Sequence, residues 1–245
     1  MKNTLHSKLL TKEDMINKEK VPHWVAEEFQ TFHNIVTDPT FPCYFGIHAQ
    51  KKGELRYTYL SHNDWSHFPD TVRDFLYLMH EDRSVRRGLF VFVEPEREER
   101  SIEYYRAYFW RLLDYLHERD KKEWPAHIPK NPDHHLWAFS FDGEPFFTFG
   151  NAPAYKQRKT RDLGNCLVIG MQPRMIFEGL EGDRPTGIKS RQSVRERVEA
   201  WDNLPKHPNI SHYGDENHRE WKQYFIGDDV KPITGKCPFH HKSSS

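Results

Sequence analysis

Two of the three cysteines lie beside proline and aromatic residues, Cys43 in "TFPCYFG" and Cys237 in "KCPFHH". A cysteine thiolate is a nucleophile and a metal ligand, whereas a buried thiol packs as a small hydrophobic group. Apolar residues alternate through 41–48, which predicts a strand with Cys43 on its apolar face. That position favours packing of Cys43 over direct chemistry.

Cys237 lies in a loop-like tail for which three interpretations are open. Together with His240 and His241 it supplies part of a zinc site, without an identified fourth ligand. A Cys-Pro dipeptide in a flexible segment is also typical of motifs in which a thiolate meets ferric haem iron. The third interpretation is a packed thiol.

Two of the 16 histidines stand out in "KHPNISHYG". Pro208 biases the backbone of His207 towards an extended form, and His212 follows five residues later. A neutral imidazole in such a segment is a candidate metal ligand, and the alternative is a polar loop.

A basic cluster, "YKQRKTRDLG", contains Arg158 and Arg161 between an aromatic hairpin and the next strand. The structural interpretation is a solvated loop. The functional interpretation is a carboxylate-binding site, because guanidinium groups bind carboxylates through two parallel hydrogen bonds.

The elements that must position these residues follow from apolar spacing. Helical spacing predicts helices over 22–36, 70–79, 99–122 and 193–204. Strands are predicted over 41–48, 55–60, 88–95, 136–141, 145–150 and 165–173, with hairpin turns at "AQKKGEL" and "DGE". Strands in hairpins with irregularly placed helices indicate an α+β fold, with a mainly antiparallel sheet, flanking helices and one compact domain.

Composition excludes several classes of function. The 36 basic and 36 acidic residues leave no basic field for nucleic acid or an anionic membrane. No apolar run is long enough for a signal peptide or a membrane span, and three scattered cysteines do not form a disulfide framework. A cytoplasmic protein is therefore expected. Gly-rich phosphate loops, G-x-S-x-G and H-E-x-x-H are absent from the sequence.

The chain resembles the YqcI/YcgG family of bacterial proteins from about Asp38 to Phe239. Six stretches in the family's order carry the resemblance: "DPTFPCYFGIHAQ", "LWAFSFDGEPFFTF", "YKQRKTRDLG", "RQSVRERVEAWDNLPKHPNISHYGD", "EWKQYF" and "KCPF". The expected organisation is a polar arm over 1–20, a YqcI/YcgG-like domain over 21–239 and a tail over 240–245.

Some members of that family are described as haem-dependent N-hydroxylases of arginine or a related guanidine. The resemblance therefore implies haem b, O2, an external electron donor or redox partner, and a small cationic substrate such as arginine. His207 is ranked first as the axial iron ligand, followed by Cys43, with His212 and Cys237 behind. Arg158 and Arg161 are the candidate contacts for haem propionates or a substrate carboxylate.

A guanidine substrate also needs an anion. Glu94, Asp142 and Glu144 lie at predicted strand ends or in the hairpin turn, and their charge makes them candidates. The alternative function is a haem sensor or carrier without catalysis, in which Cys237 and Pro238 form a regulatory contact. A family member that binds another ligand in place of haem is the third hypothesis.

Overall fold

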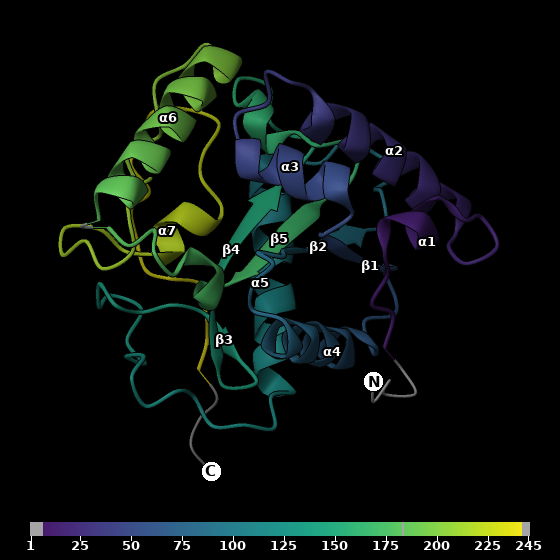
Figure 1. The fold of residues 1–245 in the computed structure, drawn as a ribbon, viewed down its shortest axis with the longest axis horizontal. Coiled ribbons are helices and arrows are strands. Elements are labelled where there is room, and N and C mark those ends of the chain that lie inside the picture. The colour runs from purple at the N-terminus through teal and green to yellow at the C-terminus, as the bar shows by residue number, and fades with distance from the viewer. Residues whose placement is uncertain (1–6, 183, 242–245) are drawn as a thin grey trace.

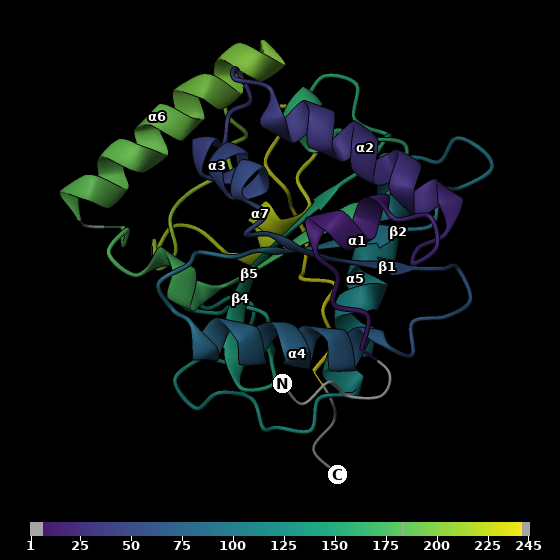
Figure 2. The ribbon, with the colours of Figure 1, turned by 45° about the vertical axis from the view of Figure 1, so that its right-hand side comes forward.

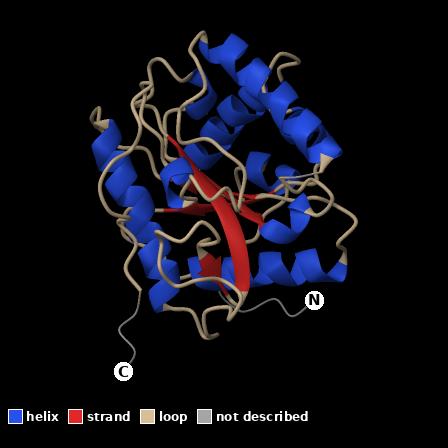
Figure 3. Cartoon of the chain, turned by 90° about the vertical axis from the view of Figure 1, so that its left-hand side faces the viewer, coloured by secondary structure: helices blue, strands red, loops and turns tan. Residues whose placement is uncertain are grey.

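The computed structural model describes residues 7–182 and 184–241, which form one five-stranded sheet enclosed by helices (Figures 1 and 3). The strand order is β1-β2-β5-β4-β3. The strands are β1 (Arg56–Leu60), β2 (Leu89–Val93), β3 (Ser140–Phe141), β4 (Glu144–Asn151) and β5 (Val168–Pro173). The predicted α+β class is confirmed.

The sheet is mixed, so the prediction of a mainly antiparallel sheet needs correction. β1 and β2 pair in parallel, and the other three pairings are antiparallel. A parallel pair needs a crossover connection, and the helix α4 (Phe68–Glu81) supplies it between β1 and β2.

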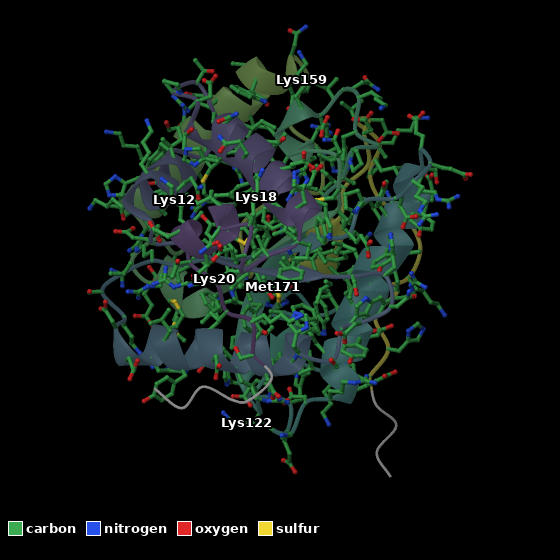
Figure 4. All side chains as sticks on the ribbon, turned by 90° about the vertical axis from the view of Figure 1, so that its right-hand side faces the viewer. Lys12, Lys18, Lys20, Lys122, Lys159 and Met171 are labelled. Carbon is green, nitrogen blue, oxygen red and sulfur yellow. The ribbon has the colours of Figure 1, made fainter. Side chains whose placement is uncertain are left out.

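Helices cover both faces of the sheet (Figure 2). α4 and α5 (Ile102–Glu118) bury one face, and α2 (His23–Thr37) and α3 (Tyr44–Lys52) lie over the other. The remaining helices are α1 (Lys12–Ile16), α6 (Pro185–Asp202) and α7 (Trp221–Tyr224), with short 3-10 turns η1 (Lys159–Arg161) and η2 (Arg174–Phe177). Met171 of β5 lies in the interior, whereas Lys122 and Lys159 project at opposite ends of the molecule (Figure 4).

α5 forms where helical spacing predicted it. The Ser101 side chain accepts a hydrogen bond from the backbone N–H of Tyr104 and caps the first turn. Leu112, Leu113 and Leu116 are fully buried on its inner face. Local capping and an apolar stripe agree here, so the helix follows from sequence alone.

The strand predicted over 41–48 is wrong, because α3 begins at Tyr44. Cys43 is the residue that caps this helix, and Phe45, expected on the apolar face, is 41% exposed. Gly53 ends the helix in the left-handed conformation, with φ of 69°. The predicted hairpin turn is therefore a helix end.

The described part of the N-terminal arm packs against the domain. Leu10 and Tyr57 exchange two backbone hydrogen bonds of 2.8 and 2.9 Å. Thr11 and Asp14 form a reciprocal cap at the start of α1, and Met15 is fully buried. Residues 1–6 of the expected arm and 242–245 of the expected tail lie outside the described residues.

α6 runs along one edge of the fold (Figure 1) and starts eight residues earlier than the predicted helix. Its side chains are mostly polar, and its last two turns contact the body of the protein. Trp201 packs against Phe41, with ring centroids 5.7 Å apart, and Asp202 reaches the segment that carries Arg158.

Candidate functional site

A row of incompletely covered aromatic rings begins at Phe149, which packs with the α2–α3 core, and continues through two rings that pack against the α4–α5 core. We call Phe147, Phe149 and Phe177 the aromatic row, and each is half-buried. The rings of Phe147 and Phe149 are 5.7 Å apart, and those of Phe147 and Phe177 are 6.3 Å apart. Alternation along β4 places Phe147 and Phe149 on the same face. The three neighbouring rings form a partly exposed apolar surface along β4 and at the end of η2.

The Phe149 ring lies against its neighbour on β5, Gly170, which has no side chain. A Cβ atom added at Gly170 would lie 2.3 Å from the Phe149 ring. Glycine is thus required at this position by a close approach rather than by an unusual backbone angle.

An arginine stands at each end of the aromatic row. Arg161 lies 5.5 Å from the Phe149 ring centroid, and Arg174 lies 5.9 Å from that of Phe177. Arg174 is paired with Glu220 at 2.7 Å and stacks 3.4 Å over the Tyr213 ring. Arg161 is half-buried and donates weakly to backbone carbonyls at 3.3 and 3.4 Å.

Arg158, the other arginine expected to meet a carboxylate, has its guanidinium enclosed by the protein. It is 1% exposed and donates to the carbonyl oxygens of Pro205, Gly227 and Asp229 at 2.5–3.2 Å. Its Nη1 lies 3.8 Å from the buried carboxylate of Asp202. These contacts make Arg158 an internal cross-link between three loops.

His207 is fully buried next to Arg158. Burial, with the positive charge of Arg158, lowers the pKa of His207 to about 4, so the imidazole is neutral at pH 7. Its Nδ1 accepts a hydrogen bond from the backbone N–H of Asn209 at 3.2 Å. A neutral imidazole that accepts at Nδ1 carries its proton on Nε2, so ligation of iron through Nε2 would require that proton to leave.

Cys43 lies at the start of α3, where backbone amides converge on its sulfur. Its Sγ accepts a hydrogen bond from the Gly46 N–H at 3.3 Å. Burial raises the pKa of the Cys43 thiol, and the amides of Gly46 and Phe45 and the charge of Arg197 oppose that rise. A helix N-terminus stabilises a negative sulfur, which is the form that binds a metal.

The last two turns of α6 bring the Cys43 segment and the His207 cluster to one region. Trp201 touches Phe41, two residues before Cys43, and the next residue, Asp202, touches Arg158 beside His207. Sequence positions 43 and 207 are thus connected through one helix end.

The other two ligand candidates lie elsewhere. His212 packs over Gly182 and lines an open, polar groove of about 480 Å³ between α6 and the loop that contains Lys206. Cys237 packs against the core of the α4–α5 face, and burial raises the pKa of its thiol to about 12.

The three proposed substrate carboxylates do not meet in one site. Asp142 pairs with Lys122 at 2.9 Å and Glu144 with His80 at 3.1 Å, both at the β3–β4 turn. Glu94 follows β2 and accepts a hydrogen bond from the His62 N–H at 3.0 Å. The strand register places Glu94 at the opposite end of the sheet, where β4 ends at Asn151.

No sequence motif marks Arg197, Asp202 or Asp228 as a functional residue. Asp228 accepts from the backbone N–H groups of residues 156–158 at 2.8–3.1 Å, and Asp202 accepts from Thr160. These acidic residues looked like a helix end and a polar tail. A usable signal was the excess of unpaired basic residues in "YKQRKTR", because buried charges need partners.

Within residues 7–182 and 184–241, no group of three or more histidine, cysteine or acidic side chains is arranged to hold a metal ion. The same residues include no helix with the length and hydrophobicity needed to span a bilayer. Haem iron takes a single protein ligand on one side, so its requirement differs from that of a bare ion.

The fold and site define a single α+β domain with a partly exposed aromatic surface flanked by two arginines, and with a cysteine that caps a helix. Residues 32–240 match the sequence model of the YqcI/YcgG family, and the chain belongs to that family.

Curated relatives match this chain nearly from end to end. "Uncharacterized protein YcgG" of Bacillus subtilis is 35% identical, over 91% of each chain. "Uncharacterized protein YqcI" of the same organism is 33% identical, over 91% of this chain and 90% of the relative. "Putative N(omega)-hydroxy-L-arginine synthase DcsA" of Streptomyces lavendulae is 28% identical, over 92% of this chain and 89% of the relative. No solved structure gives a significant match.

Proposed function

We propose that this protein is a haem-dependent N-hydroxylase of a small guanidine or amine substrate that resembles arginine. The observation that carries the reaction type is the match over 92% of the chain to the relative named for N-hydroxy-arginine synthesis. One oxygen atom of O2 joins the substrate nitrogen and the other leaves as water. Two electrons and two protons complete the balance, and the electrons come from an external donor.

In this proposal Cys43, ahead of His207, would hold the haem iron. The Gly46 N–H is already aimed at its sulfur, and the start of α3 favours negative charge there. His207 has its proton on the nitrogen that would bind iron, because its other nitrogen accepts from Asn209. Haem held through a thiolate supplies an iron centre at which O2 is activated.

The aromatic row provides the apolar surface for the cofactor, and Arg161 is the contact for a propionate. The hydrogen bonds from Arg161 to the carbonyl oxygens of Gly150 and Gln223 are long, at 3.3 and 3.4 Å, so its guanidinium can donate to a stronger acceptor. Arg158 is assigned a structural role, because its donors are held by three carbonyl groups.

Glu94 is the proposed contact for the cationic end of the substrate. Among the three candidate carboxylates, it lies at the end of the sheet shared with Arg161. Its hydrogen bond from the His62 N–H uses one carboxylate oxygen, which leaves acceptor capacity for a guanidinium group.

The test is an optical spectrum of purified protein produced with an ample haem supply, recorded ferric and then reduced with CO. We expect stoichiometric Soret absorption and the red-shifted ferrous–CO band of a thiolate ligand. The Cys43→Ser variant should lose that band, and Cys237→Ser should keep it. Incubation with arginine, O2 and a reductant should then yield the N-hydroxylated product by mass spectrometry.

Each alternative has a distinct outcome. Folded protein that takes up no haem after reconstitution would overturn the proposal. An imidazole-type band that persists in Cys43→Ser and disappears in His207→Ala would reassign the ligand. Stoichiometric haem without turnover of guanidine or amine substrates would leave the protein as a haem carrier or sensor.

A further inference from the structure

Arg197, on the penultimate turn of α6, holds the segment that leads into Cys43. Its Nη2 donates to the carbonyl oxygens of Pro39 at 2.8 Å and Phe41 at 2.6 Å. Its Nε donates to the carbonyl oxygen of Pro42 at 3.3 Å. One guanidinium therefore fixes three of the four peptide carbonyls between residues 39 and 42.

The other backbone hydrogen bonds of this segment are local, because the N–H groups of Thr40 and Phe41 both donate to Asp38, at 2.7 and 3.0 Å. Pro39 and Pro42 have no backbone N–H, and the segment lies between the end of α2 and the start of α3. The direction of the Pro42 carbonyl fixes the peptide plane that joins Pro42 to Cys43. Cys43 must keep its non-helical backbone, with φ of −87° and ψ of 89°, for its sulfur to face the Gly46 N–H.

The sulfur is packed as well as hydrogen-bonded. A Cβ atom added at Gly46 would lie 3.5 Å from the Cys43 Sγ, so the thiol rests directly on the first turn of α3. A small rotation of the turn before Cys43 would separate the sulfur from both the amide and this backbone. The arginine also brings a positive charge near the sulfur.

We propose that Arg197 is a positioning residue for Cys43, which holds the sulfur at the start of α3 by fixing the three carbonyl groups before it. The link to iron chemistry rests on the proposed function, in which Cys43 is the axial ligand. The geometric part of the proposal concerns the chain alone.

The same helix offers a matched control. Arg191 lies six residues earlier and also donates to three carbonyl oxygens, those of Leu180, Glu181 and Gly182, at 2.7–3.3 Å. Removal of either guanidinium costs α6 three contacts to backbone carbonyls, but only Arg197 touches the Cys43 segment. A general effect of loosening α6 would therefore appear in both variants.

The experiment compares the full-length wild type with Arg197→Met, Arg197→Lys and Arg191→Met. Amide hydrogen exchange of Gly46 is followed by NMR without haem, at a temperature where thermal melts show all four proteins folded. We expect exchange of the Gly46 amide at least tenfold faster in Arg197→Met and an intermediate increase in Arg197→Lys. Arg191→Met should leave Gly46 at the wild-type rate and speed exchange around residues 179–182.

Two results would overturn the inference. One is a Gly46 exchange rate unchanged in Arg197→Met and Arg197→Lys, and the other is an equal increase in Arg191→Met. If Arg197→Met does not fold, the test is the comparison of the Gly46 exchange rates of Arg197→Lys and Arg191→Met.

The haem-loaded proteins give the second readout. Arg197→Met should show a mixture of thiolate and non-thiolate ferrous–CO bands, whereas Arg191→Met should show the wild-type band alone. Identical bands in the wild type and Arg197→Met would overturn the link to the iron ligand. Wild type that binds no haem refutes the proposed function and with it that link, while the exchange result still decides the geometric part.

Discussion

The guanidinium of Arg158 lies 3.8 Å from the carboxylate of Asp202, and both side chains are shielded from solvent. The pair joins the loop before β5 to the last residue of α6, beside buried His207. Three segments that contribute to the candidate site thus meet around one buried ion pair. Its integrity is a condition for the site as well as for the fold.

Asp202→Ala should lower the free energy of unfolding by about 3–5 kcal/mol, because it leaves a buried guanidinium without its counter-charge. It also removes the acceptor for the Thr160 N–H and hydroxyl. Urea titration with tryptophan fluorescence measures the change. Glu99→Ala, which removes an exposed ion pair with Lys156, is the control and should change stability by less than about 1 kcal/mol. Equal effects of the two substitutions would contradict this description.

The stability should depend on pH through His207. Its folded-state pKa, about 4, lies below the ordinary value of about 6.5, so the unfolded chain binds more protons between these values. The free energy of unfolding therefore falls as pH falls through this window. We expect a loss of about 2 kcal/mol from this group between pH 7 and pH 5.

The difference between wild type and His207→Gln isolates that loss from the other titrating groups. Urea midpoints at pH 7, 6 and 5 should converge for the two proteins as pH falls. Parallel pH profiles would show that His207 is not held neutral in the folded state.

Gly170→Ala should lower the free energy of unfolding by about 1–3 kcal/mol, because its Cβ would overlap the Phe149 ring. Gly88→Ala places a Cβ at an ordinary contact distance of 3.5 Å from the Phe90 ring and is the matched control. In a Phe149→Ala background the cost of Gly170→Ala should largely disappear. Thermal or urea unfolding of the wild type, the two single variants and the double variant gives the coupling free energy between the two positions. If Gly170→Ala is equally destabilising in both backgrounds, the strain does not arise from the Phe149 ring.

Met15→Ala should cost about 2–5 kcal/mol, because the side chain is fully buried in the α2 core. Its neighbour Ile16 is 54% exposed, and Ile16→Ala should change stability by less than about 0.5 kcal/mol. The pair tests whether the described part of the N-terminal arm belongs to the folded domain. Equal, small effects in urea titrations would show that the arm does not contribute to the stability of the folded domain.

The sequence was sufficient where local and global signals coincide. Ser101 and the leucine stripe of α5 predict the same helix that packing requires. At residues 41–48, the alternation of Phe41, Cys43 and Phe45 predicted a strand where the chain forms a helix. The sequence "KKG" at 51–53 indicated a helix end, because glycine commonly follows the last turn of a helix. The order of strand, helix and apolar strand over 56–93 is also typical of a parallel crossover. The predicted hairpin between 41–48 and 55–60 left no place for that pairing.

The candidate site was less accessible to sequence reasoning, because its partners come from distant segments. Arg158 lies in a charged stretch typical of a surface, and the carbonyl groups that enclose it come from residues 205, 227 and 229. The tautomer of His207 is set by Asn209, a contact that depends on the loop conformation. The Cys43 environment required knowing that a helix begins at Tyr44. The sequence was enough to identify the arginine, histidine and cysteine side chains as candidates, but their roles depend on tertiary contacts.

The clamp of Arg197 on residues 39–42 joins positions more than 150 residues apart in the chain. A ribosome adding about 5–20 residues per second needs roughly 8–30 s to proceed from Cys43 to Arg197. During that interval residues 39–42, which lead into Cys43, lack the guanidinium that holds their carbonyl groups in the finished protein. Acquisition of the mature cysteine environment is therefore a late event of biosynthesis, so truncated nascent chains should expose a thiol that the finished protein protects.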